Sequence, residues 1–143
     1  KVIGHNLETV QRLQAGVRDR RANYAQSLGV LEYIKKKSPG TFTKSALMLG
    51  LGEKEDEVLQ AMDDLRGVGV DFITLGQYLQ PTGKHLPVKE FISPEKFSWY
   101  AQRAREKGFL YCAAGPFVRS SYRAGEFFME NAVRKSQCTN QKV

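Results

Sequence analysis

The sequence predicts an α/β fold with about three to four parallel strands and flanking helices. Short apolar runs at 45–49, 70–75 and 109–113 are separated by segments whose apolar residues have helical spacing. Strands that alternate with helices in this way pair in parallel through right-handed crossovers. The 143 residues suffice for one modest domain, whereas a closed barrel of eight such units needs roughly 250 residues.

Two helices are expected before the first long apolar run. An apolar pair at 2–3 indicates a clipped strand, and Asn6 is placed to cap a helix over about 7–16. A second helix is expected over about 23–37, and the Ser-Pro-Gly turn that follows would end it. Its apolar stripe consists of Tyr24, Leu28, Leu31 and Ile34.

The middle of the chain predicts a strand, a helix and a second strand. The run at 45–49 is continuously apolar, which is typical of a strand covered on both faces. A third helix is expected over about 53–66, because the acidic residues of its first turn suit the positive end of a helix dipole. The run at 70–75 is the next strand.

A long connection over 76–93 follows that strand. Loops longer than about 12–15 residues are uncommon and often functional. Ser93 followed by Pro94 is typical of a helix start, and Gly108 is placed to end this fourth helix. The run at 109–113 then forms the last strand.

The end of the chain predicts a separate unit. We expect a final helix over 123–135 and a polar tail over 136–143. Residues 1–122 would therefore form the main α/β unit, and residues 123–143 an appended helix and tail.

Composition and charge exclude several classes of protein. The net charge is +7, but the cations are spread among carboxylates, and the densest run, at 35–37, lies at a helix end where it favours the dipole. We therefore expect no nucleic-acid partner. No apolar run approaches the roughly 20 residues that span a bilayer. Cys112 and Cys138 form neither a disulfide framework nor a zinc motif, and Cys112 lies in an apolar run typical of a buried thiol.

Candidate chemistry lies where the predicted strands end, because ligands of open parallel sheets bind outside the carboxyl ends of the strands. One such segment is the turn from Gly50 to Glu53. Its glycines allow close backbone approach before a helix N-terminus, which would hold a phosphate, a carboxylate or an adenine edge. A plain strand-to-helix turn fits equally well. It is not a dinucleotide fingerprint, because position 55 is Glu.

Other strand ends carry polar side chains. Asn6 and Glu8 would bind the two hydroxyls of a ribose, with a capped helix as the alternative. Gln77 and Gln80 suit an amide-bearing or polar substrate, although loop glutamines are usually just solvated. Ser120 and Ser121 lack the surrounding elbow and the nearby histidine of a hydrolase nucleophile, and a serine alkoxide could instead ligate a metal.

Seven short segments in one order span most of the chain. They are His5-Asn-Leu-Glu-Thr9, Val17-Arg-Asp19, Tyr24-x-Gln-Ser-Leu28, Thr43-Lys-Ser-x-Leu-Met-Leu-Gly-Leu-Gly-Glu53, Leu75-Gly-Gln-Tyr-Leu-Gln-Pro-Thr82, His85-Leu-Pro-Val88 and Gly115-Pro-x-Val-Arg-Ser-Ser-Tyr122. Together they resemble the lipoyl synthases, which are radical S-adenosylmethionine enzymes. The resemblance implies the C-terminal part of a TIM-like, partial βα barrel.

The resemblance also implies an activity and its cofactors. Lipoyl synthases insert two sulfur atoms, at C6 and C8, into an octanoyl chain carried on a protein lysine. They use S-adenosylmethionine and two 4Fe–4S clusters, which are held by a Cys-x3-Cys-x2-Cys motif and three further cysteines. The chain contains neither motif. We therefore expect a fragment that lacks its cluster ligands and is inactive alone.

Individual residues take roles from the family pattern. The second serine of Arg-Ser-Ser-Tyr, Ser121, corresponds to an iron ligand of the auxiliary cluster. The residues implied to contact the cofactor are Asn6, Glu8, Arg18, Gly50, Gly52 and Glu53. Those implied to contact the substrate are Lys44, Ser45, Gln77, Gln80 and Arg119.

Partners and compartment follow from the same resemblance. We expect an octanoylated lipoyl-domain or H-type carrier protein and an electron donor such as ferredoxin or flavodoxin. The compartment would be a mitochondrion or plastid in a eukaryote, and the cytoplasm in a bacterium. Two alternatives remain: a non-catalytic module that docks a carrier protein or a larger assembly, and a small open-sheet nucleotide-binding protein.

Overall fold

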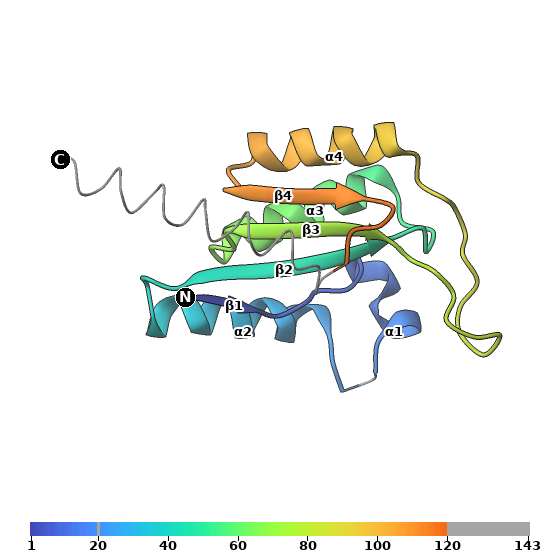
Figure 1. Cartoon of the computed structure of the whole chain (residues 1–143). Coiled ribbons are helices and arrows are strands. Elements are labelled where there is room, and N and C mark those ends of the chain that lie inside the picture. Colours follow the sequence, from blue (N-terminus) through green and yellow to red (C-terminus); the bar gives the residue numbers. More distant parts are fainter. Residues whose placement is uncertain (20, 120–143) are drawn as a thin grey trace.

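A computed structural model describes residues 1–19 and 21–119, and within them the chain forms one parallel four-stranded sheet (Figure 1). The strand order follows the chain, β1-β2-β3-β4, and every neighbouring pair is parallel. This confirms the predicted α/β class with three to four parallel strands. The strands are β1 Val2–Gly4, β2 Phe42–Leu49, β3 Phe72–Gln77 and β4 Tyr111–Gly115.

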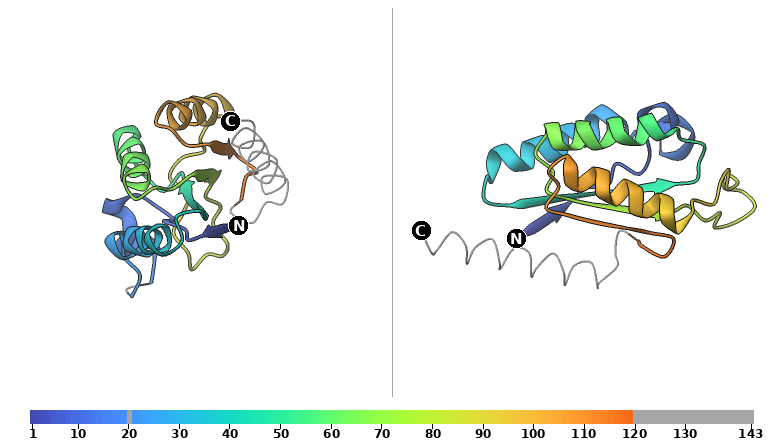
Figure 2. Two further views of the ribbon diagram at one scale, coloured as in Figure 1. Left: turned by 90° about the vertical axis from the view of Figure 1, so that its left-hand side faces the viewer. Right: turned by 90° about the horizontal axis from the view of Figure 1, so that it is seen from above.

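The helices lie together on one face of this sheet (Figure 2). The side chain of Asn23 caps α2 by accepting from the amide of Gln26, and Ser93 caps α4 by accepting from the amide of Lys96, as the sequence predicted for Ser93. None of the helices in the described ranges is long and apolar enough to cross a bilayer. The helical elements are η1 Gln11–Leu13, α1 Gln14–Val17, α2 Tyr24–Lys37, α3 Glu55–Gly67 and α4 Pro94–Glu106.

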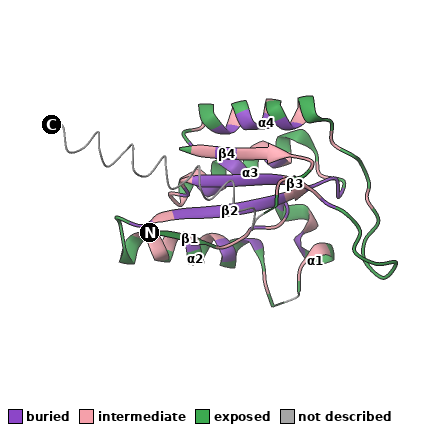
Figure 3. Cartoon of the chain, in the orientation of Figure 1, coloured by how far each residue is buried: buried purple, intermediate pink, exposed green. Residues whose placement is uncertain are grey.

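The core fills the space between the sheet and these helices. Successive side chains of a strand point to opposite faces, and alternate positions such as Leu47 and Leu75 pack against the helices. Both faces of β2 are nevertheless almost entirely buried, as predicted for its apolar run (Figure 3). The helices contribute to this core with residues that include Leu31, Val58, Met62, Leu65, Phe97 and Tyr100.

The predicted helix over 7–16 is wrong at its start. Residues 5–8 instead continue beyond β1 along the side of β2, and Asn6 caps no helix. The amide of Glu8 donates to the carbonyl of Ala46 at 2.9 Å, and the amide of Met48 donates to the carbonyl of Glu8 at 2.8 Å. Because the backbone of Glu8 is engaged on both sides by β2, helical geometry begins only at Gln11.

Other boundaries move by a few residues. β2 begins three residues earlier than predicted, because its first residues pair with β1. Helix α3 begins at Glu55 rather than at Glu53. The predicted helix at 123–135 and the polar tail at 136–143 lie outside the described residues, so the proposed division of the chain after residue 122 stays a prediction.

The long connection over 78–93 is confirmed, and it folds back onto the end of β2. The amides of Lys89 and Glu90 both donate to the carbonyl of Gly50, at 2.8 and 3.3 Å. Gly50 has φ +101°, and a Cβ placed there would collide with the side chain of Gln77 and the carbonyl of Glu90. Glycine is therefore required where the loop meets the strand end.

We predict that Gly50→Ala lowers the free energy of unfolding by about 2–4 kcal/mol, since it adds left-handed strain to a steric clash. Gly29→Ala is the matched control, because Gly29 lies in α2 with nothing within 4 Å of an added Cβ. That change should stabilise the protein by about 0.5–1 kcal/mol. Urea denaturation of both variants makes the comparison, and a Gly50→Ala protein as stable as wild type would contradict the close approach.

Candidate functional site

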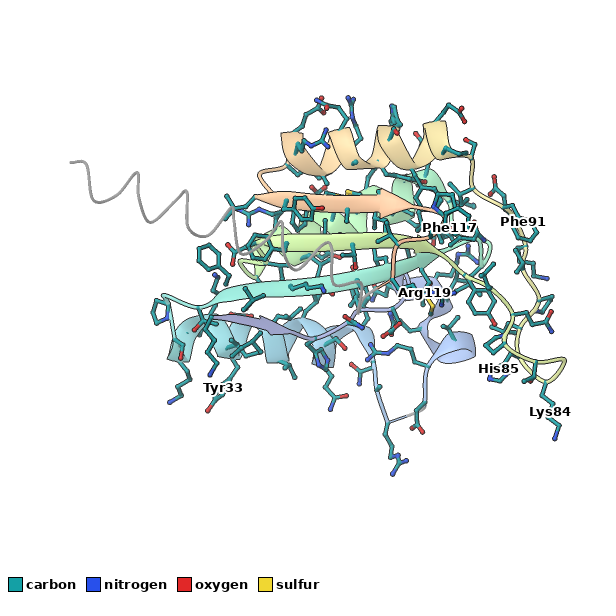
Figure 4. The ribbon with its side chains drawn as sticks, in the orientation of Figure 1. Tyr33, Lys84, His85, Phe91, Phe117 and Arg119 are labelled. Carbon is teal, nitrogen blue, oxygen red and sulfur yellow. The ribbon has the colours of Figure 1, made fainter. Side chains whose placement is uncertain are left out.

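A pocket of about 310 Å³ lies over the carboxyl halves of β2 and β3. Its floor includes Ala46 and Thr74, which belong to the sheet face that does not pack against the helices. Glu8 lines one side, and Arg119 lines the rim, where Figure 4 marks it beside the strand ends. Parallel sheets hold ligands at this edge, so the pocket is the candidate site.

Small residues make the hollow. Gly76 lies on β3 beyond Thr74, and a Cβ there would collide with the carbonyl of Val118. The segment that follows β4 therefore crosses closely over β3 and roofs the pocket at Val118. The remaining lining near the mouth is largely apolar and includes Met48, Tyr78, Leu79 and Pro81.

Glu8 is held in an unusual backbone conformation. It has φ +73°, the only positive φ of a non-glycine residue in the described ranges. Such a conformation is costly and persists where the surroundings impose it, often at functional sites. Here the two backbone hydrogen bonds to β2 impose it, and they place the residue against the pocket. The ribose-binding role of Glu8 stays a prediction.

Backbone amides of the glycine turn after β2 already have hydrogen-bond partners within the protein. The carboxylate of Glu53 accepts from the amides of Gly50 and Leu51, at 2.6 and 2.9 Å. The carbonyl of Gly52 accepts from the guanidinium of Arg12 at 2.9 Å. An anion bound at these amides would have to displace Glu53. Contact between this turn and a cofactor stays a prediction, but the turn has a structural explanation of its own.

The two candidate glutamines tie down the loop at 78–93. The amide nitrogen of Gln77 donates to the carbonyl of Glu90 at 3.0 Å, and its oxygen accepts from the amide of Ile92 at 2.9 Å. Gln80 donates to the carbonyl of His85 at 3.0 Å. Both side chains therefore bind backbone, and only Gln77 also lines the pocket. Their contact with a substrate stays a prediction.

Other candidates lie away from this pocket. Arg18 donates to the hydroxyl of Ser27 at 2.7 Å and lines a second pocket of about 320 Å³ together with His5. Burial and the nearby Arg18 lower the pKa of His5. Ser45 is fully buried on the helix side of β2, where its hydroxyl accepts from the amide of Leu7 at 3.0 Å.

Lys44 and Asn6 complete the set of candidates that the structure describes. Lys44 is buried on the pocket side of β2, one row of the sheet below Ala46. Asn6 is half-buried in the segment beside β2. The pocket thus brings together Glu8, Gln77 and Arg119 from the predicted residues.

An iron–sulfur cluster does not fit the described residues. No group of three or more His, Cys, Asp or Glu side chains in residues 1–19 and 21–119 is arranged to hold a metal ion. Cys112 lies on the helix side of β4, and burial raises the pKa of its thiol to about 12. Metal ligation needs a thiolate. Ser121, the predicted iron ligand, lies outside the described residues, as does Cys138.

Sequence reasoning missed Thr74. It was counted as one residue of an apolar strand, yet it lines the pocket with a buried hydroxyl. The available signal was its position: a polar side chain two residues before Gly76, on the face opposite Ile73 and Leu75.

Comparison with known proteins finds close relatives along nearly the whole chain. The chain is 58% identical over 133 residues to a protein of Kluyveromyces lactis named lipoyl synthase, mitochondrial, a match that covers 93% of this chain and 36% of that protein. The protein of the same name from Caenorhabditis elegans is 55% identical over 136 residues, covering 95% of this chain and 38% of that protein. Lipoyl synthase 1, chloroplastic, of Oryza sativa subsp. japonica is 57% identical over 136 residues, with 95% and 37% covered.

The chain therefore spans little more than a third of the length of the curated relatives it matches, and the match lies in their C-terminal part. No family model matches the chain.

We predict that Gln77→Leu loosens the loop at 78–93, because two hydrogen bonds that hold its far end are lost. The local stability of the loop should fall by about 1–3 kcal/mol. Amide hydrogen exchange and limited trypsin cleavage at Lys84 and Lys89 would report the change. Gln102→Leu, at an exposed position of α4, is the control, and equal protection of the loop in both variants would refute the role of Gln77.

We predict that the thiol of Cys112 resists alkylation in the native protein. Its folded pKa, about 12, lies above the usual 9.0, so the thiolate stays scarce up to pH 10 and the folded state loses stability only as the pH rises above 9. Iodoacetamide labelling at pH 8–10, followed by mass spectrometry of the Cys112 peptide, should be slow without urea and fast with it. Rapid labelling of the folded protein would show that the thiol is not buried.

Proposed function

The chain belongs to the lipoyl synthase family, and on that premise we propose that it serves in the insertion of sulfur at C6 and C8 of a protein-bound octanoyl chain. The observation that carries the proposal is the identity of 55–58% to lipoyl synthases over more than nine-tenths of the chain. The pocket at the carboxyl edge supports it, because it offers an apolar wall with a few polar groups, as small-molecule sites usually do.

We propose that the four strands are the C-terminal part of a TIM-like barrel. Sequential parallel strands with all helices on one face are what a βα barrel requires, since each crossover must return on the outside. The opposite face, which carries Ala46 and Thr74, would then line the barrel interior. Barrels of this kind place their sites at the carboxyl ends of the strands, where the pocket lies.

The pocket fits S-adenosylmethionine by the chemistry of its side chains. Glu8 offers a carboxylate that accepts from ribose hydroxyls, and Thr74 offers a buried hydroxyl that has no partner among the described residues. When reductively cleaved, S-adenosylmethionine supplies the radical that removes hydrogen from an unactivated carbon. The chain's own part is to bind and orient the cofactor and the acyl chain, and to exclude water with the apolar wall formed by Met48 and Val118.

The residues that would hold the iron–sulfur clusters lie outside the described part of the chain. Within residues 1–19 and 21–119, no group of three or more His, Cys, Asp or Glu side chains is arranged to hold such a cluster. The 143 residues contain no Cys-x3-Cys-x2-Cys motif, so the cysteine ligands of both clusters would have to come from elsewhere, and Ser121 stays an expected iron ligand. The chain alone should therefore be inactive, and the organelle names of its relatives agree with a mitochondrion or plastid.

Docking of a carrier protein is a second role that one observation favours. Phe91 and Phe117 are 73% and 89% exposed, and Figure 4 shows both beside the carboxyl edge of the sheet, with Lys84 at the tip of the nearby loop. Exposed aromatic side chains at this edge, on a chain of net charge +7, suit an acidic protein that presents its acyl-lysine to the pocket. A non-catalytic module would use the same surface.

We predict that Glu8→Gln weakens the binding of S-adenosylmethionine about tenfold, because a charge-assisted hydrogen bond contributes about 1.5 kcal/mol or more. Isothermal titration calorimetry of the protein at its native length measures this. Glu95→Gln, exposed in the first turn of α4, should bind as wild type does. Equal affinities of wild type, Glu8→Gln and Glu95→Gln would show that Glu8 does not bind S-adenosylmethionine.

The reaction itself is tested by incubating the native-length protein with S-adenosylmethionine, a reductant and an octanoylated lipoyl domain. Mass spectrometry of the domain should detect the lipoyl group. Carrier binding without any sulfur insertion would instead support the non-catalytic module.

A further inference from the structure

Thr74 presents a buried hydroxyl with nothing to bond. The residue is 3% exposed, and its hydroxyl oxygen has no hydrogen-bond partner among the described residues. Buried polar groups in native proteins are nearly always paired, and each exception calls for an explanation. Of the four unpartnered buried side-chain atoms in the described ranges, this is the one that lines the pocket at the carboxyl edge.

The sheet cannot satisfy this hydroxyl from either side. β3 lies between β2 and β4, and Thr74 is in register with Ala46 on one neighbour and with Ala113 on the other. Neither alanine carries a polar side-chain atom, so no side chain of this row can pair with the threonine hydroxyl. The row Ala46–Thr74–Ala113 therefore consists of small side chains with one polar atom at its centre.

Large side chains stand at one end of this row. The next row towards the amino ends of the strands consists of Lys44, Phe72 and Tyr111, whose large side chains stand beside it. Phe72 is fully buried and stacks on Phe42 with ring centroids 5.5 Å apart. Thr74 thus belongs to the row of the pocket lining that lies furthest towards the amino ends of the strands.

We propose that the Thr74 hydroxyl is a ligand contact of this pocket, and that it hydrogen-bonds to a polar group of a nucleoside ligand of the S-adenosylmethionine type. This inference rests on the proposed function and deepens it. Glu8 and Arg119 line the same pocket, so a ligand with hydroxyl, ammonium and carboxylate groups finds a partner for each. A purely hydrocarbon ligand would leave the hydroxyl unpaired, which costs binding energy.

The decisive comparison is Thr74→Val with Thr74→Ser, in the protein at its native length. Valine keeps the branched shape and removes only the hydroxyl, whereas serine keeps the hydroxyl. For S-adenosylmethionine, calorimetry should give a dissociation constant about tenfold higher for Thr74→Val and within about twofold of wild type for Thr74→Ser. Equal affinity of wild type and Thr74→Val would overturn the proposal.

A second measurement separates this role from a structural one. Without ligand, Thr74→Val should unfold at the same urea concentration as wild type or a higher one, since no internal hydrogen bond is lost. Thr43→Val is the matched control, because Thr43 is equally buried in a neighbouring strand but donates to the carbonyl of Gly69 at 3.3 Å. The control should lower the urea midpoint and leave ligand affinity unchanged. A midpoint lowered as much by Thr74→Val would overturn the inference.

Binding measurements with two ligands, S-adenosylmethionine and an octanoyl-lysine peptide, distinguish failure of this inference from failure of the proposed function. If wild type binds S-adenosylmethionine and Thr74→Val binds it equally well, only the role of Thr74 fails. If the Thr74→Val defect affects an octanoyl-lysine peptide and not S-adenosylmethionine, the ligand assignment is wrong. If wild type binds neither, the proposed function fails together with this inference.

Discussion

All four strands run parallel and neighbour one another in chain order, and this constraint governs the rest of the structure. Each connection has to return to the amino end of the sheet, and each returns with its helix on the same face. One face of the sheet is therefore committed to the core with side chains such as Leu47 and Ile73. The other face is free to carry small residues, and it is there that the pocket forms.

Polar side chains at the carboxyl edge hold the backbone of that edge in place through hydrogen bonds. Glu53 occupies the amides of the glycine turn, Gln77 holds both the start and the end of the following loop, and Ser45 holds the segment that carries Glu8. These contacts fix backbone that would otherwise be mobile loop, so the pocket is shaped before a ligand arrives. Preformed sites bind more tightly because less ordering remains to be done on binding.

The strands and three of the helices were predictable because their apolar residues keep a clear period. The helix over 7–16 was not, since Leu7, Val10 and Leu13 have helical spacing although residues 5–8 are bound to β2. The strand that binds residues 5–8 lies about forty residues further along the chain, so the spacing of nearby apolar residues gives no sign of it. A pocket at the carboxyl edge was predictable from topology alone, but its lining was not. It depends on which residues stand side by side across strands, as Ala46 and Ala113 stand beside Thr74.

The loop at 78–93 is clamped near both ends, because Gln77 reaches across to Glu90 and Ile92, and Gly50 receives the amides of Lys89 and Glu90. The tip around Gly83 and Lys84 is exposed and lies beyond these clamps. Lengthening a loop costs little free energy, which grows only with the logarithm of its length. The tip is thus a natural place for inserted sequence, such as an epitope or a fluorophore attachment site, that leaves the pocket wall in place.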